Sequence, residues 1–438
     1  MATEPESLQE TIKTMLENIP KRTIANDPFT ISRIPPFIRE NHKDFYEPQM
    51  VPIGPYHHNE ERFLEMEEHK RHYLHDFLER NSQVNAGAYI DAVQNVMKYA
   101  SDYYREPIYL SDDKFVQMLL LDGCFILELV LKLGNDKHRC LCWARWDFMS
   151  ILSDLLLIES QIPFFVLEKL YAVSKGLDGY KSPVDSDLKK LVVNNLFVKY
   201  FGDNLQTSRV QRLFEGPVHH LLHLYHELSL PNPETRKECY KASSHRQKNH
   251  RLPLVIPSAT RLLELGFVLR KQDSIENCEV TLKHRTRIRI PRLIIDSTRQ
   301  TLLMNLLAFE HGLEETKCRW TGLMVMMNCL VKDKKDLEIL QRSGIVLNLL
   351  PSEDEMIQFF SQLSKQVTSD FSDHYFWDLF EQVNVSCEAY FRQKRARLMH
   401  EYFNNRWAVI SFVSSIVAIF LSTVQTLVSV YTYRRRFN

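Results

Sequence analysis

The spacing of apolar residues predicts a protein built mainly from α-helices. Asp112–Leu133 is apolar nearly all round, which is typical of a buried helix. Residues 147–174 predict two buried stretches interrupted at Ile162-Pro163, because a proline inside a helix ends or kinks it. Apolar residues at helical intervals predict further helices at 6–19, 60–80, 186–201, 208–228, 298–313, 318–332, 335–343, 353–367 and 373–403.

One region departs from the helical pattern. Residues 234–251 contain few apolar side chains and are expected to form an exposed basic loop. Short runs at Phe267–Leu269, Val280–Leu282 and Arg285–Ile290 then predict β-strands. The expected fold is therefore a large multi-helix domain with a small β element near residues 265–292 and one C-terminal transmembrane helix.

The same region is basic. Residues 234–292 hold 14 basic and 6 acidic residues. Lys283, Arg285, Arg287 and Arg289 alternate, so in a strand they would lie on one face. This basic surface is either a solvated strand face or a site for anionic lipid headgroups. Nucleic acid is disfavoured, because no aromatic residues interleave with the cations.

The C-terminal segment from Trp407 to Tyr433 carries no charged residue over 27 residues. As a helix it is about 40 Å long, which exceeds a hydrocarbon core of roughly 30 Å. Trp407, Tyr431 and Tyr433 stand at its ends, where interfacial aromatic residues are common. The segment is predicted to cross a membrane once.

The flanking charges predict an orientation. Five basic residues precede the segment, and Arg434-Arg435-Arg436 follow it in the basic tail 434–438. The excess before the segment favours an N-terminus on the cytosolic side. Because the first residues lack the apolar run of a signal peptide, most of the chain is expected in the cytosol. This arrangement is typical of a tail-anchored protein of the plasma membrane or an endomembrane.

Small and polar residues form a stripe within this segment. Ser411, Ser415, Ala418, Ser422 and Gln425 follow one another at intervals of four and three. Such stripes let membrane helices approach closely and hydrogen-bond to one another. We therefore predict a homo-oligomer or a partner helix here; the alternative is an anchor that simply contains many serines and threonines.

Composition narrows the function. The 438 residues carry zero formal net charge, which argues against a chain-wide nucleic-acid binder. Twelve glycines are few for this length and argue against glycine-rich phosphate loops. The expected division is an N-terminal amphipathic segment at 1–30, a helical domain at 31–403, the membrane helix at 407–433 and the tail.

Signatures of known catalytic sites are absent, and we predict neither a cofactor nor a metal site. His219, His223 and His226 recur at helical spacing but lack further ligands. Glu159 and Asp122 lie in apolar runs, so their side chains should enter a buried hydrogen-bond network. That network either fixes the core or lines a site, in which His57 or His58 would join them as acid–base groups.

Several motifs resemble the plant family known as domain of unknown function 247, in the family's order and spacing. They are Ile34-Pro35-Pro36-Phe37-Ile38-Arg39, Ile53-Gly54-Pro55-Tyr56-His57-His58, Leu120-Leu121-Asp122-Gly123-Cys124-Phe125-Ile126-Leu127-Glu128, Glu159-Ser160-Gln161-Ile162-Pro163-Phe164-Phe165-Val166-Leu167, Ile256-Pro257-Ser258-Ala259-Thr260, Asn305-Leu306-Leu307-Ala308-Phe309-Glu310, Arg395-Ala396-Arg397 and Tyr402-Phe403-Asn404-Asn405-Arg406-Trp407-Ala408. The chain departs from the family at Ser160, where Asn is frequent, and at Arg406, where Pro is frequent.

The resemblance implies a mostly helical plant protein with one C-terminal membrane helix, and it implies no activity. Some grass members are associated with self-incompatibility, which favours recognition or signalling over metabolism. The leading hypothesis is a membrane-anchored interaction protein without catalysis. The alternative is a membrane-bound enzyme that uses the Asp122/Glu159 network.

Overall fold

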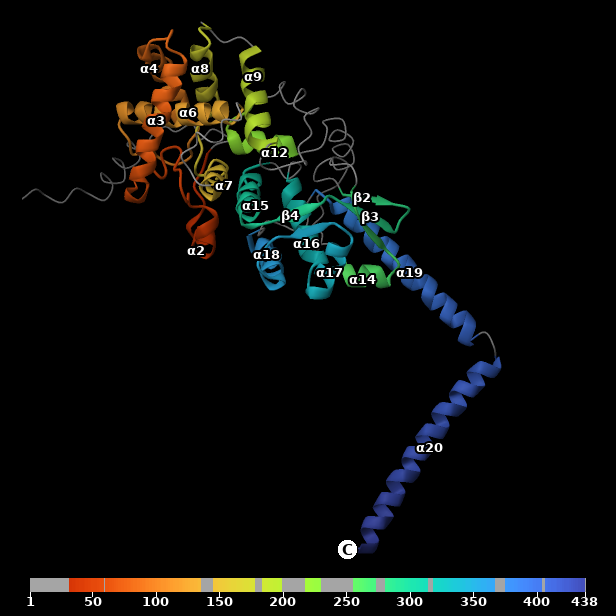
Figure 1. Ribbon diagram of the computed structural model, residues 1–438. Coiled ribbons are helices and arrows are strands. Elements are labelled where there is room, and N and C mark those ends of the chain that lie inside the picture. Colours follow the sequence, from red (N-terminus) through yellow and green to blue (C-terminus); the bar gives the residue numbers. More distant parts are fainter. Residues whose placement is uncertain are drawn as a thin grey trace, which may run out of the picture.

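Helices dominate the computed structural model, as the apolar spacing predicts (Figure 1). The structure describes residues 31–58, 60–134, 145–177, 183–198, 217–229, 255–272, 280–313, 318–366, 375–403 and 406–437. The predicted helix at 6–19 and the basic loop at 234–251 lie outside these ranges. Within them, the buried apolar side chains from Ile31 to Cys387 form one continuous core.

The first part of the chain is a group of helices around a buried central one. In chain order its elements are α2 (Pro36–His42), η1 (Lys43–Phe45), η2 (Glu61–Phe63), α3 (Leu64–Arg80), α4 (Ala86–Gln94), α5 (Met97–Ser101), α6 (Asp112–Gly134), α7 (Arg145–Asp154), α8 (Phe164–Ser174), α9 (Pro183–Val192), the π-helical turn η4 (Val193–Val198) and α12 (Leu221–Ser229). Helices α3, α4 and α8 pack on α6, whose side chains are buried over most of its length. The apolar pattern around α6 predicts this central position.

Local chemistry sets several helix boundaries. Pro163 stands directly before α8, so the predicted interruption at this proline is confirmed. Asp296 caps α15 by accepting a hydrogen bond from the N–H of Arg299 at 2.8 Å. Asp333 caps α17 in the same way. Such caps satisfy N–H groups that have no partner within their helix.

The second part of the chain combines helices with two small sheets. Its elements are α14 (Ala259–Glu264), β1 (Val268–Lys271), β2 (Thr281–Lys283), β3 (Arg287–Ile290), β4 (Leu293–Ile295), α15 (Ser297–Glu310), α16 (Arg319–Leu330), α17 (Lys334–Arg342), β5 (Val346–Asn348), α18 (Glu353–Gln366) and α19 (Trp377–Phe403). One sheet has the order β1-β3-β2, with β1 parallel and β2 antiparallel to β3. The other pairs β4 with β5 in parallel. The small β element expected near 265–292 is confirmed.

Some predicted boundaries were wrong. The strand expected at Arg285–Ile290 begins at Arg287, because His284 and Arg285 have positive φ values of 52° and 63° and form the turn after β2. Such φ values fit a tight hairpin turn, not an extended strand. Helix α12 begins at Leu221, so His219 precedes it. Helices α2, α4, α5 and α14 and strands β4 and β5 were not predicted.

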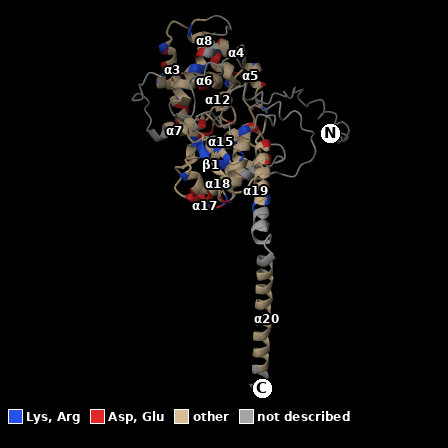
Figure 2. Cartoon of the chain, turned by 90° about the vertical axis from the view of Figure 1, so that its right-hand side faces the viewer, with Lys and Arg blue, Asp and Glu red and all other residues tan. Residues whose placement is uncertain are grey.

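The last helix, α20 (Arg406–Phe437), extends away from the rest of the chain (Figures 1 and 2). Its segment Val413–Thr432 has a mean hydropathy of 1.9, and none of it is buried against the remainder of the protein. By length and composition this segment is sufficient to span a membrane. Its large apolar side chains face outward instead of joining the core.

Candidate functional site

An irregular segment, residues 49–54, is buried from Val51 onward and is held in place by side chains from several helices. We call it the clamped segment. Asp154, the last residue of α7, accepts hydrogen bonds from the N–H groups of Gln49, Met50 and Val51 at 2.6–2.9 Å. Burial raises the pKa of Asp154 to about 6, although these hydrogen bonds act in the opposite direction. A carboxylate thus replaces the strand or helix partner that this backbone lacks.

Asp122 holds the end of the clamped segment. Its carboxylate accepts the N–H of Gly54 at 2.8 Å and lies 2.7 Å from the Nζ of Lys70 on α3. Lys70 also donates to the Pro52 carbonyl at 2.5 Å and to Glu67 at 2.7 Å. Burial acts to lower the pKa of Lys70, but the charges of Asp122 and Glu67 outweigh it and raise that pKa. The lysine is therefore a buried cation with two carboxylate partners.

Gly54 is required at this position. Its φ is +78°, a conformation that side-chain-bearing residues rarely adopt, and an added Cβ would collide with the carbonyl oxygen of Gln161. Ser160 accepts the neighbouring N–H of Ile53 at 2.9 Å. The buried Gln161 amide donates to the carbonyls of Leu155 and Leu157. At the close approach of Gly54 to Gln161, Ser160 therefore fixes the backbone of the clamped segment and Gln161 fixes the backbone of residues 155–157.

Glu159 is the centre of a second polar cluster. It forms an ion pair with Arg39, accepts the N–H of Ile34 at 2.5 Å, and lies 3.3 Å from the Nε2 of His57. The other ring nitrogen of His57 lies 2.8 Å from Glu60. Burial acts to raise the pKa of Glu159, but the contacts with His57, Arg39 and the N–H of Ile34 outweigh it and lower that pKa.

The structure therefore brings Glu159 and His57 together and gives Asp122 different partners. The side chains of all three are buried. With a lowered pKa, Glu159 is an ionised acceptor and does not suit the role of a general acid. Each carboxylate already holds backbone N–H groups, and this arrangement stabilises the irregular chain before α3. A catalytic role for Asp122, Glu159 or His57 stays a prediction.

The histidines near α12 are part of the packing. The rings of His219 and His223 stack at 5.2 Å, and His226 lies 2.9 Å from the buried Glu310. Glu310 also accepts the N–H groups of Trp320 and Thr321. These contacts fix the helix ends against each other, and among the described residues these histidines do not form the ligand set of a metal site.

His220 provides a pH-dependent prediction. It is fully buried, and burial, with the nearby His219 and His226, lowers its pKa to about 3. Between pH 3 and 6.5 the unfolded chain binds a proton here that the folded chain does not, so stability falls as pH falls below 6.5. The expected loss is about 1 kcal/mol between pH 7.5 and 5.5. Urea unfolding at both pH values measures it.

The matched variant is His220→Asn, whose side-chain oxygen can accept the N–H of His223 as the ring does at 3.2 Å. Its stability should change less between the two pH values, because the group no longer titrates. Other titrating groups, Asp154 among them, are present in both proteins and cancel in the comparison. An equal change in both proteins would contradict the assignment to His220.

One exposed cluster has metal-binding residue types. His75, Asp76 and Glu79 on α3 have ligand atoms within 4.8 Å of one another. Asp76, however, already forms an ion pair of 2.6 Å with Lys132. This competing cation argues against a bound metal ion at the cluster.

Three of the four residues predicted from sequence to form a basic surface lie in strands of the β1-β3-β2 sheet. Ile288 and Ile290 of β3 are buried, so Arg287 and Arg289 lie on the opposite face. Lys283 stands opposite Arg287 in the register. Arg285 lies in the turn and not in the strand. Figure 2 shows lysines and arginines gathered around β1.

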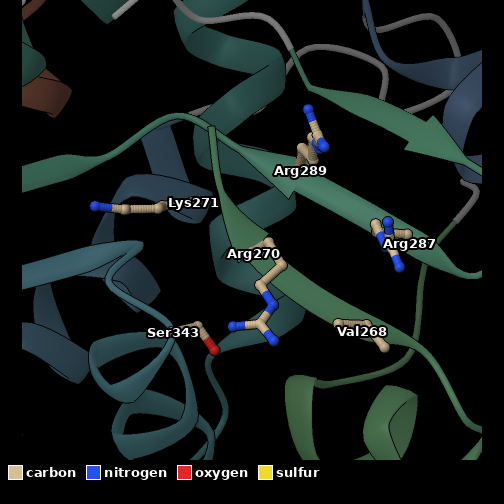
Figure 3. A pocket seen from close by; sticks show the side chains of 6 residues that line it. All are labelled: Val268, Arg270, Lys271, Arg287, Arg289 and Ser343. Carbon is tan, nitrogen blue, oxygen red and sulfur yellow. The ribbon is translucent and has the colours of Figure 1, made fainter. Parts of the chain in front are cut away.

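This face lines a cavity of about 540 Å³, which we call the basic cavity (Figure 3). Its lining residues are Val268, Arg270, Lys271, Arg287, Arg289 and Ser343. The sequence pattern did not identify Arg270, Lys271 and Ser343. The pairing of β1 beside β3 brings the first two in, and the end of α17 supplies the serine. The signal available was the Arg270-Lys271 pair directly after the strand predicted at Phe267–Leu269.

Comparison with known proteins places most of the described region within one group. The model of a family described as plant protein of unknown function matches residues 31–421. The UPF0481 protein At3g47200 of Arabidopsis thaliana is 31% identical, over 92% of this chain and 86% of its own length. The putative UPF0481 protein At3g02645 of the same plant is 20% identical, over 93% and 91%. No solved structure matches the chain.

Proposed function

The chain belongs to this plant family, domain of unknown function 247, and on that premise we propose that it is a single-pass, membrane-anchored interaction protein that acts in signalling without catalysis. The helical domain faces the cytosol and presents its surfaces to protein partners. Helix α20 anchors it as a C-terminal tail in the plasma membrane or an endomembrane. We propose two partners for it, the lipid bilayer and a second copy of the chain.

The observation that carries this proposal is the uncovered apolar surface of α20. Ile416, Ile419, Phe420 and Leu421 are each at least half exposed, although such side chains are normally buried in a soluble protein. A bilayer supplies the missing apolar surroundings over the 20 residues from Val413 to Thr432.

Gln425 supports pairing between two copies of α20. The hydroxyls of Ser415 and Thr426 donate to carbonyls of their own helix, so lipid leaves them satisfied. The Gln425 amide makes no hydrogen bond to the described part of the chain, and it lies near the middle of the apolar span. On the small-residue stripe it can meet the same amide of a second helix, where an interhelical hydrogen bond replaces an unsatisfied group.

Replacing Gln425 with leucine is expected to weaken self-association roughly 3- to 20-fold, because interhelical hydrogen bonds in membranes contribute about 0.6–1.7 kcal/mol. The protein should remain in the membrane, since leucine is more apolar than glutamine. The measurement is cross-linking or energy transfer between tagged full-length copies in membranes, after an alkaline wash that removes peripheral proteins.

The matched control is Thr423→Leu, which places the same new side chain about 200° around the helix from Gln425. Thr423 already bonds to the Phe420 carbonyl, so its loss should leave pairing unchanged. Wild-type protein that leaves the membrane in the wash would contradict the anchor. Unchanged proximity in the Gln425→Leu variant would contradict the pairing.

A further inference from the structure

We propose that the basic cavity binds a small, multiply phosphorylated anion, such as an inositol ring that carries several phosphates. This site goes beyond the proposed anchoring and pairing, because it lies in the helical domain and not in α20. Four cations and one hydroxyl line it, and no carboxylate is among the lining residues. Figure 3 shows Arg287 and Arg289 on one strand with Arg270 on the strand beside it.

The strand register places like charges next to each other. Arg270 is the Cα partner of Arg289 in the parallel pair, and Lys283 is that of Arg287 in the antiparallel pair. Neighbouring strands lie about 4.8 Å apart, and like charges at directly opposite positions destabilise a sheet. A bound anion with several charges would remove this repulsion.

The sheet holds these cations at fixed positions. Leu269 of β1 and Ile288 and Ile290 of β3 are buried on the opposite face. Their packing fixes the backbone, so the strand positions from which the cations extend are set without a ligand. A preorganised site binds more tightly because fewer groups must be ordered on binding.

The cations of the cavity also lack internal partners. Among the described residues, Arg270, Lys271, Arg287 and Arg289 form no ion pair with a carboxylate. Four exposed arginines elsewhere in the described chain, by contrast, pair with a glutamate three or four residues away. The pairs are Arg71 with Glu68, Arg261 with Glu264, Arg342 with Glu338 and Arg392 with Glu388. The described part of the chain therefore leaves these four cations of the cavity without a carboxylate partner.

The chemistry of the lining favours phosphate groups. The planar guanidinium of arginine donates two parallel hydrogen bonds to one phosphate, and three arginines can hold more than one phosphate. A volume of about 540 Å³ suits a small molecule. No aromatic residue lines the cavity, so a base has nothing to stack on, which disfavours nucleotides and nucleic acid.

The position of the cavity favours a soluble anion over a lipid headgroup. The chain just before β1 contacts α19 at Tyr390, whose hydroxyl lies 3.5 Å from the Glu264 carbonyl. From Tyr390 to the end of α19 at Phe403 the helix is about 20 Å long. The headgroup layer outside the hydrocarbon core is only roughly 5–8 Å thick. A headgroup in the bilayer reaches the cavity only if α19 lies along the membrane surface.

In the experiment, inositol hexakisphosphate is titrated into full-length protein held in nanodiscs of neutral lipid. Isothermal titration calorimetry measures the affinity. The variant Arg270→Gln/Arg289→Gln should bind more than about 30-fold more weakly, because each charge-assisted hydrogen bond makes a large contribution. The control Arg71→Gln/Arg392→Gln loses the same charge from paired, exposed positions and should change affinity less than about threefold. The unfolding temperature of the cavity variant should equal or exceed that of wild type, because a repulsive pair is removed.

A second arm uses nanodiscs that contain a phosphoinositide bisphosphate and no soluble anion. Tight binding of the soluble probe, lost in the cavity variant alone, supports the proposal. Equal weakening in both double variants overturns it, because attraction would then follow net charge. Binding to the lipid-embedded headgroup without binding to the soluble probe also overturns the proposal that the ligand is a soluble anion.

Discussion

Replacing Asp122 with alanine is expected to lower the free energy of unfolding by about 3 kcal/mol, because removal of one member of a buried ion pair leaves the other charge uncompensated. Lys70 is 1% exposed and would keep only Glu67 and the Pro52 carbonyl as partners. The N–H of Gly54 would lose its acceptor inside the core. Removal of one partner of a buried ion pair usually costs about 3–5 kcal/mol of stability. We expect the lower end of that range because Lys70 keeps its contact with Glu67. Urea unfolding of the full-length protein in detergent, followed by tryptophan fluorescence, measures the change.

The control is Asp113→Ala, which removes an exposed carboxylate from the first turn of the same helix. It should cost at most about 1 kcal/mol, the contribution of an acid near a helix N-terminus. An equal, small loss in both variants would contradict the role of Asp122 as a holder of the clamped segment. The enzyme alternative makes a different prediction, because Asp122→Ala would then abolish a reaction while leaving stability near wild type.

The polar clusters show what sequence reasoning can reach. A carboxylate inside an apolar run predicts that Asp122 and Glu159 are buried and hydrogen-bonded, since an unpartnered buried charge is too costly. Lys70 could not be identified in this way, because it lies in a charge-rich helix and the charged residues next to it in the sequence face solvent. Its burial depends on how α3 packs against α6, and that contact joins residues far apart in the chain.

The sheet shows a second limit. Alternation within Arg287–Ile290 follows from the two-residue period of a strand and places the arginines on one face. The parallel pairing of β1 with β3 is a long-range choice that local pattern does not determine. The position of Arg270 in the cavity lining therefore could not be predicted from the sequence and is known only from the folded structure. Helix α20, by contrast, was predicted to within four residues at each end, because a long apolar run identifies such a helix without knowledge of the fold, while its crossing of a membrane stays a prediction.

Two arginines at the centre of α20 are expected to prevent its insertion into a membrane. In the variant Phe420→Arg/Val424→Arg, each central arginine costs about 2.5–3.5 kcal/mol on an insertion scale, or roughly 6 kcal/mol for both. Both positions are exposed on the isolated helix, so packing within the protein should not change. Most of the protein should then remain unintegrated after translation with microsomes. Flotation followed by an alkaline wash measures the integrated fraction.

The matched control places the same two arginines near the ends of the span, in Ile410→Arg/Tyr431→Arg. Long basic side chains at these depths extend to the headgroup layer, so insertion should stay close to wild type. The comparison separates the effect of the arginines' depth in the membrane from the effect of added charge, because both variants gain two arginines and lose two apolar side chains. If the central variant floats as fully as the terminal one, the apolar surface of α20 is covered by another protein instead of lipid. In that case the helical domain is held through a partner helix and not by the bilayer itself.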